Sequence, residues 1–118
     1  MINTVILVGR VGKRPIIKYF ESGKIQTTFS LAVNRPKKSQ EHESIADWFK
    51  IEIWGRFAEI ANEYIRKGSL VGIEGRLTFK KWKDNYGNER ESFFIVASNF
   101  RLLSNKDDID IVEEPKNF

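Results

Sequence analysis

The sequence predicts a small all-β domain that carries a single helix. At 118 residues the chain has the length of one domain. Residues 48–54 alternate between two kinds of side chain with the period of two that is typical of a strand. Four further strand-like segments accompany one stretch, residues 56–67, that has the period of a helix. The chain contains no cysteine, so we expect it to fold without a disulfide or a thiolate metal site.

The first strand is expected over residues 3–11. Its second face carries the apolar residues Ile6 and Val8, so we expect both faces of this strand to be covered. Gly12 begins a break, after which residues 16–20 are expected to resume as an edge strand.

The second and third strands follow a short turn at residues 21–24, which contains a glycine. The second strand is expected over residues 25–34. Residues 35–47 are polar and should form a long loop, and residues 48–54 form the third strand. The inward residues of the second strand are expected to be Ile25, Thr27, Phe29, Leu31 and Val33.

The helix is expected over residues 56–67, with Gly68 at its C-cap. Its apolar positions are Phe57, Ile60, Ala61, Tyr64 and Ile65. Residues 70–82 form the fourth strand, residues 84–88 a turn, and residues 90–103 the fifth strand. The inward residues of the fourth strand are expected to be Val71, Ile73, Leu77 and Phe79.

Three strands, a helix and two more strands are the order of an OB-fold, a five-stranded Greek-key barrel that binds oligonucleotides in many proteins. We expect this domain to span residues 1–104. Residues 105–118 should form a short, acidic and disordered tail.

Aromatic and cationic side chains share one face of two predicted strands. On the third strand this face holds two tryptophans with a lysine between them, and the fourth strand repeats the pattern. Bases stack on aromatic rings and cations bind phosphates, so the pattern predicts a site for single-stranded nucleic acid. The alternatives are that the indoles are buried under a helix or at a subunit contact, and that Trp82 packs on its own turn. The candidate residues are Trp48, Lys50, Trp54, Arg76, Lys80, Lys81 and Trp82.

The charge of the chain is divided unevenly. Residues 1–106 contain 19 Lys and Arg against 11 Asp and Glu, whereas residues 107–118 contain five acidic residues against one lysine. A basic body favours a polyanionic ligand, and the acidic tail could compete for the same site or recruit partners. The alternative is a basic domain with a solvated tail.

Catalysis is not expected. The single histidine, His42, lies in the polar loop between glutamates, and no nucleophile, phosphate loop or metal-ligand spacing accompanies it. No cofactor or metal is expected. No segment is long and apolar enough to cross a membrane, and we expect no secretory leader.

Several motifs in this order resemble the bacterial and organellar single-stranded DNA-binding protein family. The resemblance covers nearly all of residues 3–103 and includes Trp48-Phe49, Trp54-Gly55-Arg56 and Lys80-Lys81-Trp82. It further includes residues 3–10, 64–69 and 73–75. It implies an OB-fold that assembles into homotetramers, with a dimer contact through residues 3–11.

The resemblance also implies roles for individual residues. Trp48, Trp54 and Trp82 would stack on bases. Phosphate contacts would come from Lys50, Arg56, Lys67, Lys80 and Lys81, and the wider candidate set adds Arg10, Lys18, Arg35 and Lys37. Where many family members carry another aromatic residue, this chain has Arg35-Pro36-Lys37-Lys38, so charge replaces stacking there.

The tail departs from the family pattern as well. The usual long linker is almost absent, and the chain ends in Glu-Glu-Pro-Lys-Asn-Phe, where Lys116 opposes the acidic residues. Recruitment of replication and repair proteins through this tail is therefore in doubt.

We interpret the chain as a sequence-nonspecific single-stranded DNA-binding protein that acts in replication, repair and recombination. It would work in the bacterial cytoplasm at the nucleoid, or in the plastid stroma. The alternatives are an OB-fold that binds RNA and a protein-interaction module.

Overall fold

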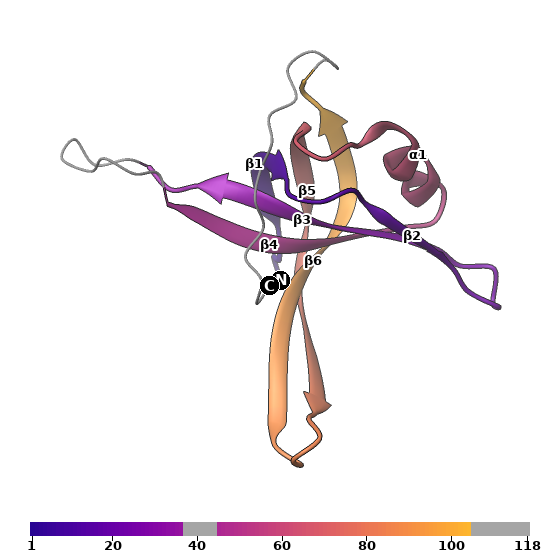
Figure 1. Ribbon diagram of the computed structural model, residues 1–118, viewed down its shortest axis with the longest axis vertical. Coiled ribbons are helices and arrows are strands. Elements are labelled where there is room, and N and C mark those ends of the chain that lie inside the picture. Colours follow the sequence, from indigo (N-terminus) through magenta and orange to yellow (C-terminus); the bar gives the residue numbers. More distant parts are fainter. Residues whose placement is uncertain (37–44, 105–118) are drawn as a thin grey trace.

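The computed structural model describes residues 1–36 and 45–104 of the chain (Figure 1). Within these residues, six strands and one helix follow one another along the sequence. They are β1 (Val5–Val11), β2 (Ile16–Tyr19), β3 (Ile25–Asn34), β4 (Ala46–Trp54), α1 (Arg56–Tyr64), β5 (Leu70–Lys83) and β6 (Glu89–Leu102).

Five of the strands close into a ring. The strand order is β1-β5-β6-β4-β3-β2, and β1 pairs back with β3 through Arg10 opposite Ala32 and Val11 opposite Leu31. β2 lies outside the ring as an edge strand along β3, as predicted. β4 and β6 are parallel, and the other neighbouring strands are antiparallel. The predicted OB-fold, with its helix after the long β3–β4 pair, is confirmed.

The core fills the ring with aliphatic side chains. Its large, fully buried members come from every strand of the ring and from the residue that follows the helix: Val11, Leu31, Ile51, Ile53, Ile65, Val71, Ile73 and Ile95. Two glycines are required where backbones meet closely. A Cβ at Gly9 would lie 2.3 Å from the carbonyl oxygen of Ala32, and one at Gly75 would lie 2.2 Å from that of Val96. No side chain fits at these two contacts.

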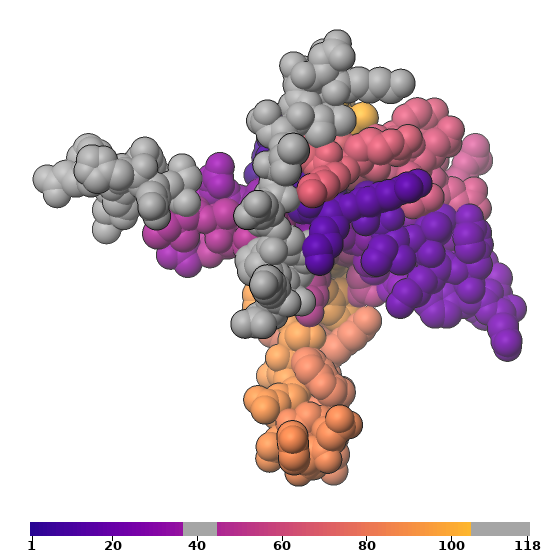
Figure 2. Space-filling view, viewed as in Figure 1, coloured from indigo at the N-terminus to yellow at the C-terminus, as the bar shows by residue number. Residues whose placement is uncertain are grey.

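The hairpin of β5 and β6 is longer than the ring. It extends from the body as a separate arm, visible at the bottom of Figures 1 and 2. Its turn is closed by Asp84, whose carboxylate accepts hydrogen bonds from the backbone amides of Tyr86 and Asn88 and from Arg90. Gly87 adopts a φ of 79°, which the turn requires and glycine permits.

Phe79 shows where the hairpin leaves the core. The sequence predicted an inward position, but Phe79 is 55% exposed because β5 has already passed beyond the ring there. Its ring faces Phe93, its partner on β6, at a centroid distance of 6.4 Å. The inward prediction for Phe79 is wrong, whereas Val71 and Ile73 are buried as predicted.

The helix is shorter than predicted. α1 ends at Tyr64, and Ile65 is already extended with φ −80° and ψ 131°. Gly68 has a positive φ of 84°, but it lies in a turn after the helix instead of at the C-cap.

The buried face of the helix also differs from the predicted apolar stripe. Ala58, Ala61 and Ile65 are fully buried, whereas Phe57 and Tyr64 are at least half exposed. Alanine lets the helix approach the strands closely enough for the Thr27 hydroxyl to donate a hydrogen bond to the Ala58 carbonyl at 2.6 Å. Larger side chains at these positions would prevent this contact.

The burial of two strand faces differs from the prediction when one protomer is considered alone. The second face of β1 is uncovered, with Ile6 73% and Val8 52% exposed. On β3, Gln26 and Ser30 lie on the face opposite the predicted inward residues, yet both are buried: Gln26 is hydrogen-bonded to Glu52, and Ser30 lies against Gly12.

Candidate nucleic-acid interface

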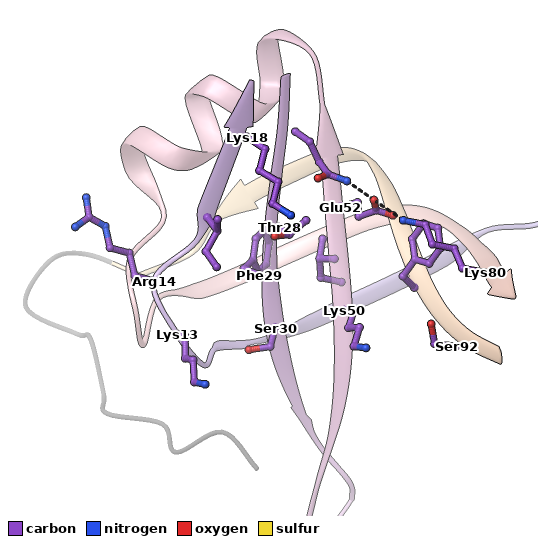
Figure 3. A pocket seen from close by; sticks show the side chains of 14 residues that line it. Lys13, Arg14, Lys18, Thr28, Phe29, Ser30, Lys50, Glu52, Lys80 and Ser92 are labelled. Atoms are coloured by element: carbon purple, nitrogen blue, oxygen red, sulfur yellow. Dashed lines mark hydrogen bonds and ion pairs between the residues drawn. The ribbon is translucent and has the colours of Figure 1, made fainter. Parts of the chain in front are cut away.

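A basic groove of about 470 Å³ lies over β3 and β4, between β2 on one side and the β5–β6 hairpin on the other (Figure 3). Five cations from four segments of the chain surround it: Lys13, Arg14, Lys18, Lys50 and Lys80. Its apolar contacts come from Ile16, Phe29, Ile51 and Phe94, and its polar contacts from Gln26, Thr28, Ser30, Glu52 and Ser92. Cations beside apolar surface suit a ligand with phosphates and planar bases.

The pairing of β3 with β4 sets the order of side chains along the groove floor. Ser30 lies opposite Lys50, and Thr28 lies opposite Glu52. Trp48 and Trp54 continue the same face of β4 at the two ends of this row. Six residue steps along the extended strand place them about 20 Å apart, which leaves room for several bases between the two indoles.

Trp54 stands at one end of the groove and is stacked on Phe20. The two ring centroids are 5.6 Å apart, and the planes are inclined by 26°. Trp54 remains 39% exposed, so Phe20 covers part of the indole and leaves the rest accessible. Arg56 and Lys24 lie beside Trp54 along a second hollow at the start of α1, which adds positive charge at this end.

Trp48 stands at the other end and is half-buried. A Cβ at Gly12 would lie 2.5 Å from the Cζ3 atom of the Trp48 ring, so the indole packs directly over this glycine. Glycine at position 12 therefore leaves the room that the indole needs against the start of the β1–β2 connection.

Trp82 lies on the projecting hairpin. It shares a face of β5 with Lys80, and it is 49% exposed. The three tryptophans therefore keep accessible surface, and neither burial beneath the helix nor a fully closed turn accounts for them.

A carboxylate lies on the floor of this basic groove. Glu52 is 5% exposed, and its Oε1 accepts a short hydrogen bond from Nε2 of Gln26. The same Oε1 lies 3.4 Å from Nζ of Lys80, as the dashed lines in Figure 3 show. The Lys80 ammonium also lies 4.4 Å from the centroid of the Phe94 ring, a cation–π contact. Lys80 is thus held at the groove by two neighbours.

Several predicted contacts lie outside the groove. Arg76 lines a different hollow, where it donates to the Thr78 hydroxyl, and Arg10 donates to the carbonyl of Gly68. Lys67 follows the helix and is exposed. Lys81 lies opposite Glu91 on the hairpin, and Lys37 falls outside the described residues.

Arg35 forms a two-pronged ion pair at the end of β3. Its guanidinium donates to both carboxylate oxygens of Asp47 at 2.8–3.1 Å. This hydrogen bonding, aided by the positive charge, holds the pKa of Asp47 below its ordinary value in spite of some desolvation. Arg35 is therefore partly neutralised where the sequence suggested a phosphate contact.

Sequence reasoning overlooked five contributors to this surface. Lys13 and Arg14 precede β2, Gln26 and Glu52 form the floor pair, and Phe20 backs Trp54. The alternation of β4 already placed Glu52 between Lys50 and Trp54, so that signal was available. The position of Phe20 depends on the fold of the β2–β3 hairpin.

The described residues contain neither a candidate metal site nor a candidate membrane-spanning helix. Across residues 1–36 and 45–104, no three His, Cys, Asp or Glu side chains are grouped so that they could hold a metal ion. The helix in this part of the chain is not of the length and apolarity that a membrane span requires.

Comparison with known proteins identifies the family of this chain. Residues 2–103 match the model of the single-strand binding protein family. A single-stranded DNA-binding protein of Thermosynechococcus vestitus is 47% identical over 92% of this chain and 88% of the relative. Single-stranded DNA-binding protein 1 of Synechocystis is 47% identical over 91% of this chain and 88% of its own length.

The fold leads to the same family. A solved structure of the Plasmodium falciparum SSB complex with ssDNA has a TM-score of 0.79 and 31% sequence identity to this chain. The match covers 88% of this chain and 96% of the other. The chain belongs to the single-strand binding protein family.

Proposed function

We propose that this chain binds single-stranded DNA without reading its sequence, along the basic groove and the three tryptophans. The observation that carries the proposal is the row from Trp48 through Lys50 to Trp54, with cations on both sides of it. Stacking contributes roughly 1–3 kcal/mol per base and tolerates any base, because every base has a π face. The family relatives named above support DNA as the ligand.

Binding alone would account for the activity. A strand held on indoles and lysines is kept from re-pairing and from nucleases, which serves replication, repair and recombination. This role needs no catalytic group, cofactor or metal ion. It would be exercised at the bacterial nucleoid or, for an organellar protein, in the plastid stroma.

We further propose that the protein assembles through β1 into a homotetramer. Ile6 and Val8 expose apolar side chains on the outer face of β1, and Leu103 lies with them along one hollow. Exposed apolar residues gathered in this way mark a protein contact more often than a free surface. The acidic residues 105–118 remain a separate candidate for recruiting partner proteins.

Quenching of indole fluorescence by poly(dT) tests the binding proposal. We expect strong quenching of the wild type, because the tryptophans themselves stack on bases. Trp82→Ala should weaken binding by roughly 1–3 kcal/mol without loss of thermal stability, since this side chain is half exposed. Unchanged emission at saturating poly(dT) would contradict the proposal.

A matched RNA tract serves as the competitor in the same titration. Stacking and phosphate contacts alone do not distinguish ribose from deoxyribose. Displacement of the DNA by an equal concentration of RNA would show that the protein does not prefer DNA.

A further inference from the structure

The carboxylate of Glu52 is the one acidic group among the residues that line the described groove. Its side chain is only 7% exposed, and its Oε1 is occupied by Gln26 and Lys80. Its Oε2 is buried and makes no hydrogen bond to any of the described residues. A buried acceptor without a partner is unfavourable, so a donor brought by the ligand would stabilise this oxygen once a neighbouring side chain has moved to uncover it.

That donor does not come from the DNA backbone. Phosphate carries the same charge as the carboxylate and offers no hydrogen to it. The bases are the part of a single strand that carries N–H groups, and the groove offers them apolar surface at Ile16 and Phe94. A hydrogen-bond donor for Glu52 would therefore come from a base, whereas the cations around it suit phosphates.

We propose that Glu52 is a specificity-determining residue: its Oε2 accepts a hydrogen bond from the exocyclic amino group of a base, cytosine in preference to thymine. The inference rests on the proposed function. Carboxylates accept hydrogen bonds from N4 of cytosine, whereas thymine carries the acceptor O4 at the corresponding position. Two acceptors facing each other repel, so one position of an otherwise sequence-tolerant track discriminates between pyrimidines.

Lys80 can leave Glu52 when a base binds there. Its side chain is 60% exposed, so the ammonium can turn from Glu52 toward a phosphate while staying near the ring of Phe94. Gln26 is buried and still donates to Oε1, which keeps the carboxylate oriented. The ion pair in the unliganded groove is then replaced by one phosphate contact and one base contact.

The test is a fluorescence titration of the full-length protein with dC and dT tracts of equal length. Glu52→Gln removes the charged acceptor, and Glu63→Gln on the exposed side of α1 makes the same change in net charge away from the groove. We expect the ratio of dC to dT affinity to fall about tenfold in Glu52→Gln, as for loss of a hydrogen bond to a charged group. Glu63→Gln should leave the ratio unchanged.

A chemical variant of the ligand keeps the test independent of folding. A tract of N4,N4-dimethylcytosine lacks the amino hydrogens, so the wild type should bind it about tenfold more weakly than the dC tract. An equal change for dC and dT in Glu52→Gln, together with undiminished binding of the dimethylated tract, overturns the base contact and leaves the proposed function intact. Failure of the wild type to bind any tract overturns both.

Discussion

The ring of Phe20 lies on the ring of Trp54, with a centroid distance of 5.6 Å and 26° between the planes. A phenylalanine from the hairpin between β2 and β3 thus holds an indole at the end of the groove. A base that stacks on Trp54 would extend this pair into a three-ring column.

Phe20→Ala is therefore expected to weaken binding of single-stranded DNA, even though Phe20 itself need not touch a base. The loss should be about 0.5–1.5 kcal/mol, the value of an aromatic pair, and smaller than the roughly 1–3 kcal/mol expected for Trp54→Ala. Titration of each variant with oligo(dT) measures the difference. Tyr19→Ala is the control, since this exposed neighbour points to the other face of β2. Wild-type affinity in Phe20→Ala would show that Trp54 needs no support.

The salt dependence of binding distinguishes the groove from the rest of the basic surface. Each phosphate neutralised on a single strand contributes about −0.7 to the slope of log affinity against log salt concentration. Lys18→Met removes a groove cation and should reduce the slope by about that amount. Arg76→Met removes the same charge from another hollow and should change the slope less. Equal slopes in the two variants would mean that the DNA binds the whole basic surface and not the groove in particular.

Gly9→Ala should destabilise the ring where β1 meets β3. The added Cβ would lie 2.3 Å from the Ala32 carbonyl oxygen, so the backbones must separate, at a cost of roughly 1–3 kcal/mol in the free energy of unfolding. Gly72→Ala is the matched control, because its Cβ would meet its nearest neighbour, a Leu103 methyl group, at an ordinary 3.6 Å. Urea unfolding of both variants gives the comparison. Similar stabilities would show that the strands yield easily at this contact.

Val8→Asp tests the assembly proposed for β1. A carboxylate on this apolar face should dissociate the oligomer, because each protomer would bring an uncompensated charge into the contact. Light scattering gives the molar mass directly. Tyr64→Asp places the same group at a similarly exposed position on α1 and should leave the mass unchanged. If Val8→Asp keeps the wild-type mass, the contact lies elsewhere.

The strands and their faces could be predicted because their information is local. Alternation over residues 48–54 correctly placed Ile51 and Ile53 in the core and the two tryptophans on the opposite face. The end of the helix could not be predicted in this way. Tyr64 and Ile65 continue the apolar period, but Ile65 is needed in the core and takes extended geometry to reach it.

The site was predicted less completely than the fold, since its pairs join distant segments. Glu52 and Lys80 are 28 residues apart, and Phe20 and Trp54 are 34 apart. Neither pair follows from periodicity, because each depends on which strands become neighbours. The exposure of Phe79 has a similar cause, as strand length alone does not say where the hairpin leaves the ring.

The position of β6 in the ring determines at which stage of chain synthesis the groove can form. β6 is the last strand among the described residues, yet it lies between β4 and β5 and supplies Ser92 and Phe94 to the groove. Until synthesis has passed Leu102, a nascent chain lacks the strand that joins the two halves of its binding surface. Unfinished or C-terminally truncated chains would therefore not compete with mature protein for exposed DNA.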